Sequence, residues 1–69
     1  MEQIKSVTLQ SVEYFSEVLS KKTTKATKHE VQYKILDFIS LNGNKNFIDF
    51  YNNAFSKNNF EEVFRILNI

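Results

Sequence analysis

Apolar residues recur at helical spacing through most of the chain. Between residues 2 and 20 they follow one face of a helix that advances about 100° per residue. Leu9 points away from this face, and the polar Gln10, Glu13 and Glu17 lie opposite it. The pattern therefore predicts a first helix over residues 2–20. Its apolar face consists of Ile4, Val7, Val12, Tyr14, Phe15, Val18 and Leu19.

A polar stretch over residues 21–28 interrupts the pattern, and a second helix is predicted over residues 28–42. Thr27 and Glu30 have the spacing of a capping box, in which each side chain binds the backbone amide of the other residue. Gly43 ends this helix, because glycine takes a positive φ at a helix carboxyl end without strain. The predicted buried face carries Val31, Ile35, Phe38 and Ile39.

Two shorter helices are predicted over residues 45–55 and 59–68. The turn between them, Ser56–Asn59, is rich in capping residues. Either Asn59 with Glu62 or Asn58 with Glu61 could cap the last helix. The sequence thus predicts an all-α fold, a small compact bundle of about four helices (2-20, 28-42, 45-55, 59-68) in a single domain over residues 1–69. The inner faces of the last two helices comprise Phe47, Ile48, Phe50, Tyr51, Ala54 and Phe55, then Phe60, Val63, Phe64 and Leu67.

Composition narrows the class of protein. The 69 residues include no Cys, no Pro and one Gly, and the formal net charge is +1. Disulfides and thiolate metal sites are excluded, and a general attraction to nucleic acid is not expected. No run approaches the roughly 18 apolar residues of a membrane span, and residues 1–10 lack the pattern of a signal peptide. We therefore expect a cytoplasmic protein without membrane contact, in the host cytoplasm if a phage or virus encodes it.

Residues suited to catalysis are scarce. The single histidine, His29, begins the second helix and is interpreted as an exposed residue rather than a general base. Glu13 with Glu17, and Glu61 with Glu62, are interpreted as solvated charge. One glycine cannot form a phosphate-binding loop. The sequence predicts no catalytic residues, no cofactor and no metal, and hence a protein that is not an enzyme.

A basic turn joins the first two helices. It contains Lys21, Lys22, Lys25, Lys28 and His29 within nine residues. These residues could bind an acidic protein surface or phosphate groups. The alternative is a solvated turn whose lysines favour the carboxyl end of the first helix.

Four further apolar residues lie outside the predicted inner faces. Tyr33 and Leu36 belong to the second helix, where the favoured interpretation is that they serve the core. Ile66 and Ile69 point away from the inner face of the last helix, which ordinarily has a solvent side. Exposed apolar clusters mark protein contacts, so all four are candidates for partner binding or a homodimer interface.

The stretch from Ile35 to Leu67 resembles a trihelical helix-turn-helix domain, with a turn over residues 55–59 that leads into a recognition helix. The resemblance implies DNA binding through Lys57, Asn58, Asn59 and Arg65. This chain departs from the pattern at several positions. Polar residues occupy two positions that the pattern buries, a phenylalanine occupies a small-residue position, and two glutamates would repel phosphate. They are Asp49 and Asn53, Phe50, and Glu61 and Glu62.

These observations favour a small non-enzymatic interaction protein that binds and modulates a larger partner protein. Inhibitors and regulators encoded by phages and mobile elements often have this size. The chain is also rich in Asn, Lys, Ile, Phe and Tyr, whose AT-rich codons fit such a source. The alternative is a DNA-binding transcriptional regulator that uses residues 35–67.

Overall fold

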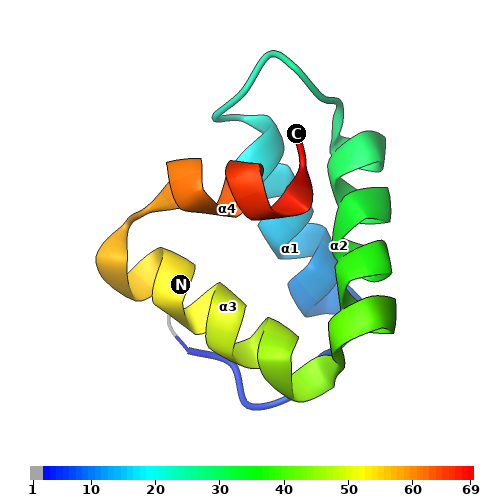
Figure 1. Cartoon of the computed structure of the whole chain (residues 1–69), viewed down its shortest axis with the longest axis vertical. Helices are drawn as coiled ribbons and strands as arrows, with labels where there is room; N and C mark the ends of the chain where they lie inside the picture. Colours follow the sequence, from blue (N-terminus) through cyan, green and yellow to red (C-terminus); the bar gives the residue numbers. More distant parts are fainter. Residues whose placement is uncertain (1–2) are drawn as a thin grey trace.

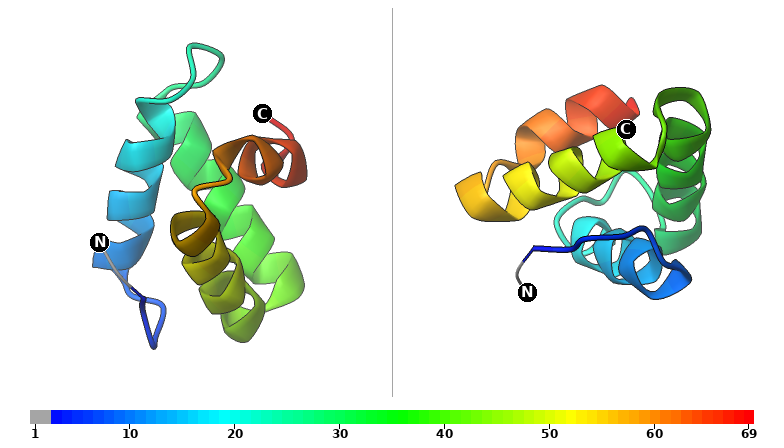
Figure 2. Two further views of the ribbon diagram at one scale, coloured as in Figure 1. Left: turned by 90° about the vertical axis from the view of Figure 1, so that its left-hand side faces the viewer. Right: turned by 90° about the horizontal axis from the view of Figure 1, so that it is seen from below.

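Four helices and no strand make up the computed structural model, which describes residues 3–69 (Figure 1). They are α1 (Leu9–Ser20), α2 (Lys28–Asn42), α3 (Asn44–Lys57) and α4 (Phe60–Leu67). α2 contacts the other three helices. α1 lies on one side of it, and the angled pair of α3 and α4 lies on another (Figure 2). The predicted all-α bundle is therefore confirmed.

The first helix begins at Leu9, seven residues later than predicted. Thr8 is its N-cap, and its hydroxyl accepts a hydrogen bond from the amide of Ser11 at 3.0 Å. The Ser11 hydroxyl in turn accepts one from the Thr8 amide at 3.0 Å, which completes a capping box with serine in place of glutamate. Residues 3–8 lie outside the helix, and Glu2 lies outside the described residues.

Residues 3–8, which we call the extended segment, contain no helix, bend at Lys5 and Ser6 and join α1 after a sharp turn (Figure 2). The Asn52 side chain of α3 binds both backbone groups of Ile4: its Oδ1 accepts from the amide at 2.8 Å, and its Nδ2 donates to the carbonyl at 3.1 Å. Ile4 and Val7 are partly buried and pack against the core. The amphipathic pattern thus predicted their burial correctly but their helical conformation wrongly.

α2 has the bounds that the sequence predicts. The Thr27 hydroxyl accepts from the Glu30 amide at 3.3 Å, and the Glu30 carboxylate accepts from the Thr27 amide at 3.2 Å. At the other end the Gly43 amide donates to the carbonyl of Ile39 at 2.8 Å. Gly43 has φ 91° and ψ 162°, so it ends α2 and precedes α3 in a conformation that residues with a side chain avoid.

We predict that Gly43→Ala lowers the free energy of unfolding by about 1 kcal/mol or slightly more, because alanine is strained at this φ. An added Cβ would meet no atom within 4 Å, so steric clash contributes nothing to the loss. Urea denaturation followed by circular dichroism measures the change. Asn44→Ala, at a neighbouring helical position, is the control. Equal stability of the wild type and Gly43→Ala would contradict the prediction.

The turn between α3 and α4 is shorter than predicted, because α3 continues to Lys57. Asn58 adopts the left-handed conformation with φ 52° and ψ 38° and ends α3. The Asn59 side chain accepts from the Glu62 amide at 3.4 Å and caps α4, which selects one of the two predicted capping pairs.

The core draws on all four helices and centres on the aromatic residues of α1 and α3. The Phe15 ring lies 4.8–6.2 Å, centroid to centroid, from four rings of α3. These contacts hold α1 against α3, while α2 and α4 close the remaining sides. The buried hydrophobic residues are Val12, Phe15, Leu19, Val31, Ile35, Phe47, Tyr51, Ala54, Val63 and Leu67.

Candidate functional site

The basic turn predicted from the sequence, residues Lys21–His29, comprises the loop between α1 and α2 and the first two residues of α2, and we call it the basic loop. Two of its lysines contact neighbouring side chains. The Lys21 ammonium lies 3.2 Å from the Glu17 carboxylate, one turn earlier on α1. The Lys22 ammonium lies 4.6 Å from the centre of the Phe60 ring at the start of α4, a cation–π distance. Lys21 and Lys22 therefore both contact neighbouring side chains, and the contact of Lys22 with Phe60 depends on tertiary packing that the sequence pattern does not reveal.

Lys25, Lys28 and His29 are the exposed remainder of the basic loop. Among residues 3–69, no carboxylate lies within ion-pairing distance of Lys25 or Lys28. His29 occupies the first turn of α2. The loop thus presents two uncompensated positive charges, which could attract an acidic surface but provide no enclosed site.

The four apolar candidates have different environments. Tyr33 and Leu36 are 68% and 47% exposed, so the favoured interpretation that they serve the core was wrong. α2 buries only one face, centred on Val31 and Ile35, and no helix covers its outer side. Ile66 is 45% exposed, in agreement with its predicted direction. Ile69 is partly buried against the core, so its predicted outward direction was wrong.

Ile66 lies where two surface hollows meet. One hollow, of about 320 Å³, lies between α3 and α4, and Phe50 and Val63 form part of its wall. The other, of about 200 Å³, lies between α2 and α4, and Phe38 and Leu41 form part of its wall. Ile66 lines both hollows. The Phe38 and Phe50 rings are stacked with their centroids 4.8 Å apart. This contact between α2 and α3 connects the wall of one hollow to the wall of the other.

We call this region the α2–α3–α4 face; the three helices that form it lie in front of α1 in Figure 1. Its edges carry charges of both signs: Lys34 and Asp37 on α2, and Lys57 and Glu62 on the other side. An apolar centre with a polar edge is the usual make-up of a protein contact surface. The apolar lining residues are Phe38, Leu41, Phe50, Ala54, Val63, Ile66 and Leu67.

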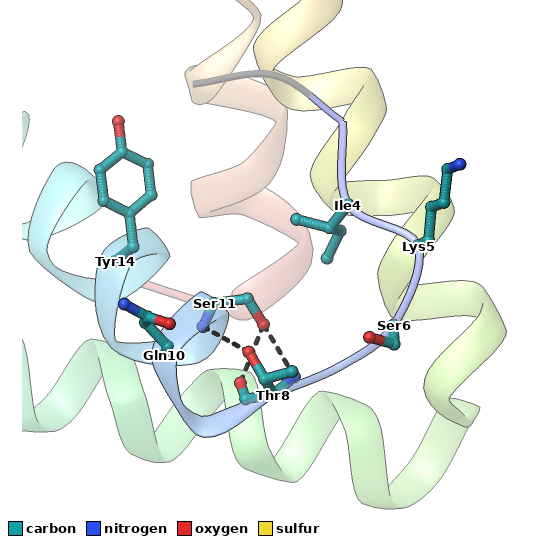
Figure 3. A pocket seen from close by; sticks show the side chains of 7 residues that line it. All are labelled: Ile4, Lys5, Ser6, Thr8, Gln10, Ser11 and Tyr14. Atoms are coloured by element: carbon teal, nitrogen blue, oxygen red, sulfur yellow. Dashed lines mark hydrogen bonds between the residues drawn. The ribbon is translucent and has the colours of Figure 1, made fainter.

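A third hollow, of about 450 Å³, lies between the extended segment and the start of α1. Figure 3 shows Ile4 on the inner side of the segment and Lys5 directed away from it. Thr8 and Ser11 in its wall are already bonded to each other in the capping box. The remaining polar groups are those of an open surface, so the hollow favours no particular ligand.

Three of the four residues that the helix-turn-helix resemblance implicates in DNA binding have structural roles here. Asn58 and Asn59 shape the turn and cap α4. Arg65 donates to the Glu62 carboxylate at 2.6 Å. This hydrogen bond, together with the negative charge of Glu62, raises the pKa of Arg65 above its ordinary value. Lys57 is exposed in the last turn of α3, so the turn presents one basic side chain without an acidic partner among the described residues.

Comparison with protein-family models, with curated proteins and with solved structures finds no match. Within residues 3–69 no cluster of three or more His, Cys, Asp or Glu side chains is suited to a metal ion. No helix in the same range is long and apolar enough to cross a membrane. The function must therefore be inferred from the sequence and the structure of this chain alone.

Sequence reasoning did not name three partly or fully exposed residues of the α2–α3–α4 face, Phe38, Leu41 and Phe50, as surface candidates. Phe38 and Phe50 were assigned to the predicted inner faces of their helices, and Leu41 to the end of α2. Their contribution depends on how three helices meet, which no local pattern encodes. Ile66, an apolar residue outside the predicted inner face of the last helix, was the one sequence signal that pointed to this region.

Proposed function

We propose that this chain is a small, non-catalytic protein-binding domain that docks on a larger partner protein and modulates it. The observation that supports the proposal is the α2–α3–α4 face, where Ile66 stands between two apolar hollows. Exposed apolar surface of this kind is unfavourable in water and gains free energy when a partner covers it. The mixed charges at its edge would fix the orientation of that partner.

The basic loop has a secondary part in this proposal. Lys25 and Lys28 would speed the encounter with an acidic region of the partner without adding much to affinity, because both side chains stay solvated. Reversal of both charges to glutamate should therefore slow association several-fold and reduce its dependence on salt. A stopped-flow or surface-binding measurement with the captured partner separates this rate from the dissociation rate.

Ile66→Asp is expected to weaken partner binding by about tenfold or more, because a carboxylate would be buried in an apolar contact. The measurement is affinity capture from a lysate of the source cells, followed by titration of the captured protein. Leu9→Asp is the matched control, because Leu9 is 69% exposed and lies at the start of α1, away from the face. Aspartate is also well tolerated in a first helical turn.

The outcomes separate the alternatives. Capture of one protein by the wild type and by Leu9→Asp, with loss in Ile66→Asp, supports the proposal. Equal capture by all three proteins would overturn the role of the face. Binding of random duplex DNA at about 50 mM salt that weakens steeply as salt is added would instead favour the DNA-binding regulator. The regulator has less support, because three of its four residues already serve the turn or an ion pair.

A further inference from the structure

The extended segment is held to the rest of the molecule through two of its residues, Ile4 and Val7. Asn52 of α3 accepts a hydrogen bond from the Ile4 amide at 2.8 Å and donates one to the Ile4 carbonyl at 3.1 Å. Ile4 and Val7 pack against the core, and the other four residues of the segment are exposed. We call the surface that these two apolar residues cover, together with the Asn52 side chain, the segment site.

The Asn52 side chain binds a backbone and not a side chain. Its oxygen and its NH₂ group pair with the amide and the carbonyl of one residue, and any extended residue except proline presents both groups on the same side. The site therefore accepts Ile4 whichever molecule supplies it. The segment seated in the structure thus shows what the site binds, which is an extended chain with apolar residues at the positions of Ile4 and Val7.

The junction with α1 allows the segment to leave its own site without unfolding the helix. Thr8 and Ser11 fix the first turn of α1 by hydrogen bonds to each other, to which residues 3–7 contribute nothing (Figure 3). Within residues 3–69, neither Lys5 nor Ser6 makes a hydrogen bond or an ion pair that would hold the bend. A straightened segment would carry Ile4 about 13 Å beyond Thr8, far enough to reach a neighbouring molecule.

We propose that two copies of this chain exchange their extended segments, so that Ile4 of each copy binds Asn52 of the other. A second copy necessarily carries the segment that fits the site, and the exchange keeps every contact of that segment. The dimer therefore differs from two monomers mainly in the conformation of the bend, and its population rises with protein concentration. A short flexible link gives the segment an effective concentration on the order of 1 mM at its own site, so exchange becomes measurable near that protein concentration.

The proposal does not rest on the proposed function, because it concerns a different surface. Neither Ile4 nor Asn52 lines the α2–α3–α4 face. Addition of Ile66→Asp to each protein in the tests below should therefore leave the exchange unchanged. Failure of the exchange would in turn say nothing about partner binding at Ile66.

Two variants with complementary defects test the exchange. Asn52→Ala keeps the segment but loses the hydrogen bonds of the site, whereas Ile4→Asp keeps the site but puts a carboxylate where the segment needs an apolar side chain. Neither variant should associate with itself, but the segment of the first should enter the site of the second. Titration of unlabelled Asn52→Ala into ¹⁵N-labelled Ile4→Asp up to about 1 mM should progressively shift the NMR signals of the Asn52 side-chain amide. The side-chain amide signals of Asn53, which is exposed on the same helix, should stay in place.

The control is a labelled protein that combines Ile4→Asp with Asn52→Ala, and none of its signals should shift. The wild type supplies a second measurement, since its dimer fraction in sedimentation should grow between about 0.1 and 2 mM and vanish in Ile4→Asp. A wild type that stays monomeric over this range, or an unchanged Asn52 signal in the mixture of the two folded variants, would overturn the proposal. So would a shift caused by a capped peptide of residues 3–8 but not by the second copy, because the site would then bind only a free extended peptide.

Discussion

Phe15→Ala should abolish cooperative folding or leave a barely stable protein. The side chain is fully buried and contacts four aromatic rings of α3, so its removal opens a cavity between α1 and α3. Truncation of a buried phenylalanine typically costs about 3–5 kcal/mol. Domains of this length have a total stability of only about 3–10 kcal/mol, so most of it would be lost. Urea denaturation followed by far-UV and near-UV circular dichroism measures the effect.

Tyr14→Ala is the matched control for this prediction. Tyr14 precedes Phe15 on α1 but is 39% exposed, and its one ring contact is with Phe55 at a centroid distance of 6.0 Å. Its removal should cost about 1 kcal/mol or less. If the two variants lost similar stability, the aromatic contacts of Phe15 would not hold α1 to α3 as described.

The bounds of α2 could be predicted from the sequence because both of its ends carry strong local signals. Thr27 with Glu30 begins the helix and Gly43 ends it, and each acts through backbone groups within four residues. The start of α1 was missed because Ile4 and Val7 keep the helical period while they pack in an extended segment. Thr8 and Ser11 were the local signal, but serine in place of glutamate makes a less familiar capping box.

The surfaces could be predicted only in part. The lysines of the basic loop are adjacent in sequence, so their clustering was evident, but the contact of Lys22 with Phe60 depends on where α4 lies. The exposure of Tyr33 was not foreseen, because the sequence does not say how many faces of α2 its neighbours cover. The α2–α3–α4 face joins Phe38, Phe50 and Ile66 from three helices, and such a meeting follows from tertiary packing.

Asn52→Ala is expected to lower the free energy of unfolding by about 2 kcal/mol, although Asn52 is only partly buried. Its side chain makes two hydrogen bonds to the backbone of Ile4, 48 residues away in sequence, and each is worth about 1 kcal/mol. Without them the extended segment should detach and withdraw Ile4 and Val7 from the core. Chemical denaturation measures the loss. Hydrogen exchange should show that the Ile4 amide, protected in the wild type, becomes unprotected.

Asn53→Ala supplies the control, because Asn53 is exposed on α3 and makes no hydrogen bond among the side-chain contacts of residues 3–69. Both substitutions raise helix propensity equally, so the difference between them isolates the bonds to Ile4. Asn52→Asp tests the two hydrogen bonds separately, because its carboxylate can still accept from the Ile4 amide but repels the Ile4 carbonyl. The free energy of unfolding of this variant should lie between those of the wild type and Asn52→Ala. The rate of trypsin cleavage after Lys5 should rise in the order wild type, Asn52→Asp, Asn52→Ala. Equal stability of the Asn52→Ala and Asn53→Ala variants would mean that the two bonds to Ile4 contribute nothing to the stability of the fold.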